Sequence, residues 1–289
     1  MVYSMTGFGQ VKSQFINKEI TVEIRCLNSK VNDFRLKIPS YYRQKELEIR
    51  RVLNDTIVRG KLDIIIDVRG EDSEEEVLLN SKLFMAYYQQ LRKLPIDLSQ
   101  ADMLNGILKF PNVIESNDNE ISDEEFAFTT RLLDEAIEKL MDFRSIEGNV
   151  IQTDLQLRIN NIITCLREVE QFEKDRIQNL KDRIWKSLEN NFNNESIDKN
   201  RFEQELMYYI ERLDITEEKV RLKQHCDYFT EELNAKVMTK SKKLGFISQE
   251  IGREINTLGS KAQHHQIQKL VVDMKDELEK IKEQLANIL

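Results

Sequence analysis

The chain has 289 residues, of which 33% are charged and 40% hydrophobic, and its formal net charge is −8. This length suffices for two domains, and the charge content, with only 9 glycines and 3 prolines, is typical of proteins rich in long helices. No apolar run approaches the roughly 20 residues of a membrane span, the first ten residues lack the features of a signal peptide, and three scattered cysteines fit a reducing compartment, so we expect a cytoplasmic protein.

Charge is distributed unevenly along the chain. Residues 1–70 carry a net charge of +5 and residues 240–289 one of +2, whereas residues 71–239 carry −15. Two explanations stay open at this point. A polyanion can bind where the two basic ends meet, or acidic surface helices merely keep the protein soluble.

The first 70 residues predict a small sheet with one helix. KEITVEIRCLN at 18–28 alternates apolar and polar residues, as a half-buried strand does. DFRLKIP at 33–39 predicts a second short strand, residues 41–57 a helix, and GKLDIIIDVRG at 60–70 a third strand.

The section that follows is less regular. EDSEEE at 71–76 predicts a charged turn, and a short strand and a helix follow to about Leu94. Pro95 and Pro111 bound an irregular or short-helical section, and a polar loop leads into a helix from about Asp123.

The second half predicts long helices. Residues 149–190 contain no glycine or proline and have a narrow apolar stripe, which indicates one long helix or two in series. A second helical arm over 201–235 is expected to run antiparallel to it after a short turn. Within that arm, Asp214 and Glu217 have the spacing of a capping box, which favours a new helix start. Residues 244–258 and 267–288 carry the stripes of two further helices.

The predicted fold class is therefore α+β. A mixed α/β domain with a small sheet is expected over residues 1–150, and a helical domain over 151–289. The helical domain consists of an antiparallel helical arm at about 151–235 and a C-terminal helical bundle that begins near 240.

SQEIGREINTLGSKA at 248–262 contains the clearest candidate for chemistry. Glu250 and Glu254 are one helical turn apart and point the same way along one border of the apolar stripe. They can share a divalent cation, or one can bind metal while the other acts as a base. Alternatively, this is a solvated helix face with Arg253 or Lys261 as the counter-ion. His225 flanks the stripe of another helix and is a possible third ligand.

Several segments together resemble the YicC family of bacterial endoribonucleases. They are SMTGFG at 4–9, VEIRCLNSK at 22–30, FRLKIP at 34–39, RGKLDI at 59–64, FRSIEGNVIQTDL at 143–155, DITEEKVRLKQH at 214–225, QEIGREINTLGSKA at 249–262 and LVVDMKDELEKIKEQLANI at 270–288. The resemblance spans nearly the whole chain and is weakest over 71–140 and 170–205. It implies a divalent-metal-dependent endonuclease, with Mn²⁺ or Mg²⁺, that cleaves RNA and assembles as a ring-like homohexamer. It also implies a link to the decay of small RNAs, with exoribonucleases acting downstream.

The polar positions of these segments give the expected site. The expected catalytic residues are Glu23, His225, Glu250 and Glu254, and the expected metal ligands are His225, Glu250, Glu254 and His264. The expected RNA-binding residues are Arg25, Asn28, Lys30, Arg59, Lys61, Arg253, Asn256, Ser260 and Lys261. This assignment requires the N-terminal strands and the C-terminal helices to meet, within one subunit or across an interface.

The chain departs from the family pattern in two places. After Asn28, where the family usually has His or Gln followed by Arg, the sequence is Ser29–Lys30, and lysine lacks the bidentate phosphate geometry of arginine. After GSKA, where the family usually has Asn-Asp, it is Gln263–His264. The histidine would be a softer metal ligand, or the metal site is weaker.

Two rival functions stay open. One is a non-catalytic RNA-binding oligomeric scaffold that delivers RNA to another nuclease, which the long helices and the absence of a compact catalytic triad favour. The other is a purely structural coiled-coil protein. The basic strand residues near 25 and 61 count against it, because a coiled coil does not need them.

Overall fold

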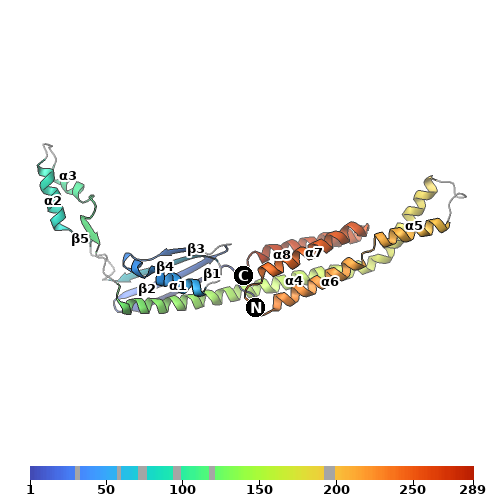
Figure 1. Ribbon diagram of the computed structural model, residues 1–289, viewed down its shortest axis with the longest axis horizontal. Helices are drawn as coiled ribbons and strands as arrows, with labels where there is room; N and C mark the ends of the chain where they lie inside the picture. The colour runs from blue at the N-terminus through green and yellow to red at the C-terminus, as the bar shows by residue number, and fades with distance from the viewer. Residues whose placement is uncertain (30–32, 57–59, 71–76, 94–98, 117–120, 192–198) are drawn as a thin grey trace. The chain divides into compact units, whose positions relative to one another are not determined.

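The computed structural model describes residues 1–289 except 30–32, 57–59, 71–76, 94–98, 117–120 and 192–198 (Figure 1). The elements in chain order are β1 (Gly7–Phe15), β2 (Lys18–Leu27), β3 (Asp33–Lys37), the 3-10 helix η1 (Ser40–Lys45), α1 (Glu46–Thr56), β4 (Lys61–Gly70), β5 (Val77–Leu79), α2 (Ser81–Arg92), α3 (Gln100–Ile107), β6 (Ile114–Ser116), α4 (Asp123–Asn191), α5 (Lys199–Arg212), α6 (Thr216–Asn234), α7 (Ser241–Ala262) and α8 (His265–Leu285). The predicted α+β class is confirmed. Among the described residues, no helix combines the length and hydrophobicity of a transmembrane span.

The chain forms two compact units. The sheet unit is Gly7–Met141, and the helical unit consists of Met1–Thr6 and Asp142–Leu289. The sequence analysis placed a single boundary near residue 150. In the structure the first six residues belong with the helices, and the second boundary falls inside α4, where no loop marks it.

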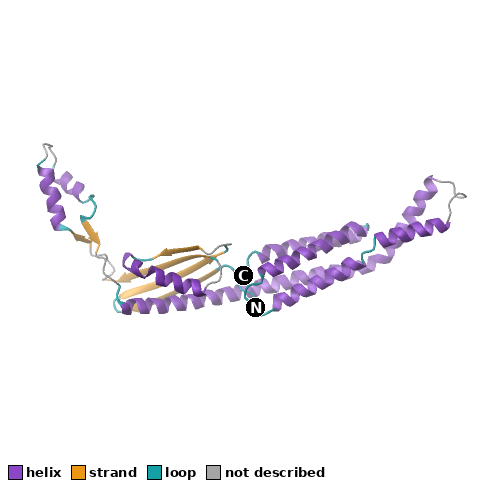
Figure 2. Cartoon of the chain, viewed as in Figure 1, coloured by secondary structure: helices purple, strands orange, loops and turns teal. Residues whose placement is uncertain are grey.

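The sheet unit is built on four strands in the order β1-β2-β4-β3. β2 pairs antiparallel with β1 and β4, and β3 pairs parallel with β4. The predicted strands at 18–28, 33–39 and 60–70 are therefore confirmed. One face of the sheet packs on α1 and the first turns of α4 (Figure 2), through buried residues that include Ile24, Ile64, Leu53, Leu132 and Ala136. A separate two-stranded pair, β5 with β6, accompanies α2 and α3.

The sequence analysis did not predict strand β1. The inward-facing positions at its start are Gly7 and Gly9, so the apolar half of the strand pattern is missing there. Gly9 is needed for packing, because a Cβ atom at this position would overlap the carbonyl oxygen of Ala136 on α4. The absence of a side chain thus lets the helix backbone lie directly on the strand.

The helical unit has one continuous core formed by α4, α6, α7 and α8. The helices expected from about 123 and over 149–190 are a single helix, α4, of 69 residues. The predicted antiparallel arrangement of α4 and the second arm is confirmed, since Gln152 on α4 bonds Asn234 while Glu173 pairs with Lys219. Each of these helices buries one narrow stripe, as amphipathic helices in a bundle do.

The second arm breaks at Asp214, where the sequence predicted a new helix start. The Oδ1 atom of Asp214 accepts hydrogen bonds from the backbone N–H and the hydroxyl of Thr216, at 3.1 and 2.8 Å. The hydroxyl contact is the main reason that the pKa of Asp214 lies below its ordinary value. The break is therefore confirmed. The predicted partner Glu217 instead pairs with Arg221 along α6.

The first residues of the chain pair with the last ones. Ser4 forms an antiparallel bridge with Ile288, and the N–H of Leu289 donates to the carbonyl of Tyr3 at 3.0 Å. The N–H of Ser4 also donates to the carbonyl of Arg144 on α4, at 3.0 Å. The segment Met1–Thr6 is therefore held by backbone hydrogen bonds on two sides, as a buried extended segment requires.

Gly148 on α4 makes room for this segment. A Cβ atom on Gly148 would overlap the carbonyl oxygen of Val2. One residue before it, the carboxylate of Glu147 accepts a hydrogen bond from the hydroxyl of Thr6 at 2.7 Å. Gly148 thus accommodates the backbone at Val2, and Glu147 binds Thr6 of SMTGFG.

We predict that Gly148→Ala destabilises the helical unit. Overpacking against the Val2 backbone is expected to cost about 1–3 kcal/mol, which exceeds the gain of about 0.5–1 kcal/mol that alanine brings to a helix interior. Urea denaturation followed by circular dichroism measures the change. The matched control is Gly245→Ala on α7, where a Cβ atom meets nothing within 4 Å. The control should be neutral or stabilising, and equal midpoints for the two variants would contradict the assigned role of Gly148.

Candidate functional site

Three of the predicted residues lie on the open face of the sheet. Ile24 and Cys26 on β2 are buried against the helices, so Glu23 and Arg25 point to the opposite side. In the register of β2 and β4, Lys61 lies opposite Leu27 and Arg25 opposite Asp63. The open face therefore presents residues of both signs from adjacent strands. It also contains a hollow of about 710 Å³ that Glu23 helps to line.

Glu23 is held in place by its neighbours. Its Oε1 atom lies 2.5 Å from Nε of Arg25, and its Oε2 atom accepts a hydrogen bond from Gln10 at 3.3 Å. The Arg25 guanidinium also lies over the Phe8 ring, 5.8 Å from its centroid, and its side chain is 60% exposed. Glu23 thus orients an arginine that remains accessible to an anion.

Asp63 is a residue of this face that the sequence analysis did not select. It lies opposite Arg25 on one side and Arg35 on the other. Its Oδ1 atom is buried and accepts no hydrogen bond from any described residue. The strand alternation of GKLDIIIDVRG placed Asp63 on the polar face but did not distinguish it from Asp67.

Of the other predicted residues of the sheet unit, only Asn28 lies within the described residues. Asn28 directly follows β2 and is exposed. Lys30 and Arg59 lie outside the described residues, and so does the departure from the family pattern at Lys30.

The helical candidates lie on α6 and α7, whose register is fixed by two ion pairs. Lys243 pairs with Glu232 at 2.6 Å, and Lys261 pairs with Glu218 at 2.7 Å. These pairs show that the two helices are antiparallel. They also bracket His225 on α6 and the 250–254 turn of α7, which therefore lie at the same level along the helix pair.

Glu250 and Glu254 have different surroundings, although both were expected on one border. The Glu250 side chain is 47% exposed and pairs with Arg253 at 3.6 Å. Glu254 is only 6% exposed and forms neither an ion pair nor a hydrogen bond with any described residue. Neither carboxylate oxygen of Glu254 is among the fully enclosed polar atoms of the described residues, whereas Oε2 of the neighbouring Glu218 is. Glu254 is therefore a largely buried acid whose carboxylate can still be reached by a cation or donor from outside the chain.

Glu218 belongs to the same region and was not predicted. It is 5% exposed, and its Oε1 atom accepts the hydrogen bond from Lys261. Its Oε2 atom is buried and accepts no hydrogen bond from the described part of the chain. Glu218 precedes His225 by seven residues, which is two helical turns on the same face, and this spacing was the available signal.

The residues present fit a divalent cation only in part. Within the described ranges, no three His, Cys, Asp or Glu side chains are grouped so that they could hold a metal ion. His225, Glu250 and Glu254 thus do not form a closed ligand set within one chain. Carboxylate oxygens are nevertheless the ligands that Mg²⁺ and Mn²⁺ prefer, and Mg²⁺ commonly takes one or two carboxylates and completes its shell with water and substrate oxygens.

His264 lies in the turn between α7 and α8. Its ring stacks on Phe172, with 5.7 Å between the ring centroids, and its Nδ1 atom is buried without a hydrogen bond to any described residue. The preceding Gln263 has a left-handed backbone, with φ of 44°, and ends α7. The stack explains how a histidine is accommodated here by packing.

The remaining predicted residues lie on the solvent side of α7. Arg253, Asn256 and Ser260 are exposed, and the Arg253 side chain is 74% accessible. The hydroxyl of Ser260 donates to the backbone carbonyl of Thr257 at 2.9 Å. One side of α7 is therefore a solvated polar face, and the border toward α6 holds a largely buried acid near the partly buried ion pair of Lys261 with Glu218. Glu250, exposed and paired with Arg253, has the surroundings of a solvated helix face, whereas Glu254 does not.

Comparison with known proteins covers almost the whole chain. Residues 2–153 match the family model described as the N-terminal region of YicC-like endoribonucleases, and residues 169–289 match the model of their C-terminal part. The probable endoribonuclease YicC of Clostridioides difficile (strain 630) is 30% identical over 297 aligned residues, which span 100% of both chains. The probable endoribonuclease YicC of Haemophilus influenzae is 27% identical over 293 residues, again over 100% of both chains.

We predict that Lys261→Met destabilises the helical unit by about 1–3 kcal/mol, because it leaves the buried Glu218 carboxylate without its donor. In the double variant with Glu218→Gln the loss should be smaller than the sum of the two single losses, as expected for residues in contact. Thermal unfolding of the four proteins gives this coupling. Lys282→Met is the matched control, because its partner Glu279 is 66% exposed and such pairs contribute little. Additive losses at Lys261 and Glu218 would show that the ion pair does not contribute to stability.

Proposed function

Because the chain belongs to the YicC-like endoribonuclease family, we propose that it is a metal-dependent endoribonuclease that cleaves RNA internally. The observation that carries the proposal is Glu254, a carboxylate with 6% exposure and no partner among the described residues, in the family's REINTLGSKA segment. RNA turnover, including small-RNA decay with exoribonucleases acting on the products, is the proposed setting, and the cytoplasm the proposed location.

In this proposal Glu250 and Glu254 hold one divalent cation, and His225 and His264 are the further candidate ligands. The cation would supply charge stabilisation at the scissile phosphate or lower the pKa of a water molecule. Glu254 is protected from bulk solvent, whereas Glu250 is accessible and must exchange its Arg253 contact for the ligand. Arg253, released from Glu250, is then available for a phosphate oxygen.

The basic residues bind the RNA backbone in this proposal. Lys261 is directed by Glu218, and Arg25 is directed by Glu23, so both cations have a fixed direction before RNA arrives. Preorganised cations stabilise the negative charge that develops during phosphoryl transfer better than mobile ones do. Asn28, Asn256 and Ser260, all exposed, would contact ribose or base edges, and Lys61, Lys30 and Arg59 further phosphates.

We also propose that the protein is a homo-oligomer, for which the family resemblance implies six copies. The support is an apolar stripe on α4 that no described residue covers: Phe143, Ile146, Val150 and Leu157, which are 46%, 69%, 67% and 52% exposed. Their spacing places them along one side of the helix. Contiguous exposed apolar surface of this kind marks protein interaction sites.

We predict that Glu250→Gln and Glu254→Gln each lower the cleavage rate at least about 100-fold, the scale of losing one acid or base. Labelled single-stranded RNA is incubated with Mn²⁺ or with EDTA, and products are resolved on a gel. EDTA should abolish cutting in the parent protein. Arg25→Ala should raise KM more than it lowers kcat, because it removes a phosphate contact. Glu283→Gln, an exposed change on α8, is the control and should cut normally.

The same experiment discriminates the rivals. If the protein binds RNA but never cuts it, with any metal, the RNA-binding scaffold is favoured over the enzyme. A protein that neither binds nor cuts RNA would leave only a structural role. If metal-dependent cutting persists in both glutamate variants, Glu250 and Glu254 are not catalytic residues.

We predict that Ile146→Glu combined with Val150→Glu dissociates the oligomer, because the subunit contact would then bury carboxylates without partners. Light scattering after size exclusion gives the mass of the parent and variant. Leu47→Glu, at a single residue that is 80% exposed on α1, is the control and should leave the mass unchanged. A parent protein of 34.2 kDa in solution would refute the oligomer.

A further inference from the structure

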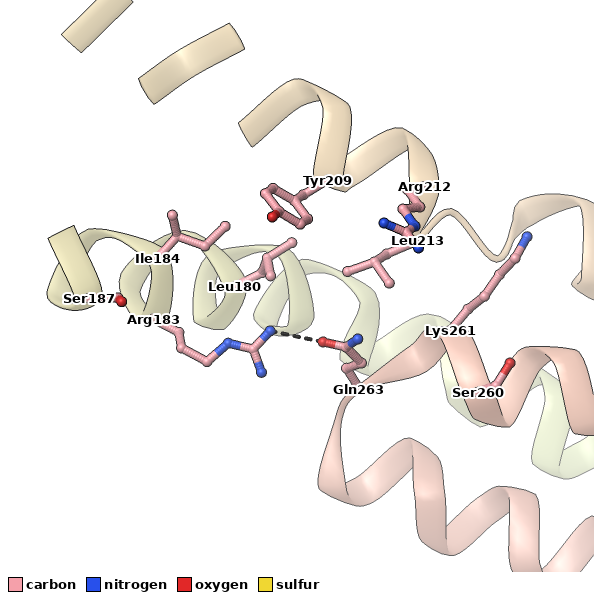
Figure 3. A pocket seen from close by; sticks show the side chains of 10 residues that line it. All are labelled: Leu180, Arg183, Ile184, Ser187, Tyr209, Arg212, Leu213, Ser260, Lys261 and Gln263. Atoms are coloured by element: carbon pink, nitrogen blue, oxygen red, sulfur yellow. Dashed lines mark hydrogen bonds between the residues drawn. The ribbon is translucent and has the colours of Figure 1, made fainter. Parts of the chain in front are cut away.

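A cationic cavity lies beyond the acidic side of α7. It is formed by the second half of α4, the end of α5 and the last turn of α7, and its volume is about 910 Å³ (Figure 3). That is at the upper end of the range for small-molecule sites. A smaller cavity of about 110 Å³ adjoins it and shares Leu180, Arg183, Leu213 and Gln263.

Three cations from three helices line the cavity, and none of the described lining residues is acidic. Arg183 donates to the side-chain oxygen of Gln263 at 2.8 Å, a neutral acceptor that orients the guanidinium and leaves its charge uncompensated (Figure 3). Arg212 forms no ion pair with any described residue. Lys261 is paired with Glu218, so roughly two positive charges remain for a ligand. Cations held apart by a folded scaffold without counter-ions indicate an anion site.

The same helices also contribute apolar side chains to the cavity. Tyr209 on α5 lies next to Leu180 and Ile184 of α4, and the tyrosine is 41% exposed (Figure 3). An inorganic anion has no apolar surface to bury against these side chains. A nucleotide has both a π-face that stacks on an aromatic ring and a phosphate that binds guanidinium groups.

We propose that this cavity binds a nucleotide of single-stranded RNA, with its phosphate at Arg183 and Arg212 and its base at Tyr209. The proposal rests on the proposed function and extends it. Lys261 lines the cavity and follows Glu254 by seven residues, about 10 Å along the helix axis. RNA that reaches Glu254 would thus also be bound by Arg183, Tyr209 and Arg212, which were not among the RNA-binding residues expected from the sequence. Single-stranded RNA fits better than a duplex, because a stacked base must leave its own stack to reach the ring.

The test is RNA binding by the full-length chain carrying Arg183→Ala and Arg212→Ala together. Fluorescence anisotropy with a labelled 12-nucleotide single-stranded RNA is measured in EDTA, at several salt concentrations. The two arginines share one phosphate, so the double variant should lose about 0.7 from the slope of log K against log salt, with an affinity about tenfold lower near physiological salt. Tyr209→Ala should lower the affinity and leave the slope unchanged, since stacking releases no counterions.

Arg167→Ala is the matched control, because Arg167 is exposed on α4 outside the cavity. It should keep the parent affinity and slope. Circular dichroism verifies that each variant is folded, and Arg183→Lys with Arg212→Lys should recover most of the slope. A double alanine variant that binds RNA as the parent does, with the same slope, overturns the proposal.

A free nucleotide offers the same chemistry and is tested separately with AMP. AMP that binds the parent and not the double variant, while RNA affinity is unchanged in both, would make the cavity a nucleotide site and overturn the RNA assignment. Cleavage assays keep the two proposals apart. If Glu254→Gln stops cutting but the double arginine variant binds RNA normally, only the proposal for the cavity is rejected. If Glu254→Gln still cuts RNA, the proposed catalytic residues are rejected, and the result of the binding experiment stays valid.

Discussion

The antiparallel contact between α6 and α7 determines which side chains of the candidate site are buried and which are accessible. Two ion pairs, Lys243 with Glu232 and Lys261 with Glu218, lie near its ends and fix one register. A slip by one helical turn would break both and leave two largely buried carboxylates uncompensated, which is costly. Because the register is fixed, Glu254 stays buried at the level of His225, and Lys261 stays directed at the border between the acidic region and the cationic cavity.

Most of the fold could be predicted from local patterns, and the failures have physical causes. β2 and β4 have buried residues at every second position, so alternation revealed them. β1 has glycines where side chains should be, because a helix backbone occupies that space. The continuity of α4 was missed because Gly148 separates the two predicted helices in the sequence, whereas in the structure this glycine lies inside the helix and makes room for Val2. Periodicity reports which face is buried but not against which partner.

The candidate site was predictable in its residue types and less so in their roles. Helical spacing placed Glu250 and Glu254 on one border, but only the packing of α6 shows that one is buried and the other open. Glu218 was missed because an acid at the edge of an apolar stripe usually lies in solvent. The net charge of residues 71–239 gave no sign of the cationic cavity, because Arg183 and Arg212 lie in this stretch, which has the most negative net charge of the chain. Three helices remote in sequence bring these charges together.

The pairing of the first and last residues has a consequence for synthesis on the ribosome. All four strands of the main sheet precede residue 71, so they can associate while the rest is still being translated. The segment that contains Tyr3 and Ser4 can contact Arg144 on α4 earlier, but it can pair with Ile288 and Leu289 only after those two residues have left the exit tunnel. A contact between such distant points closes slowly. The pairing of Tyr3 and Ser4 is thus completed late in folding, and until then this segment remains available to chaperones and peptidases.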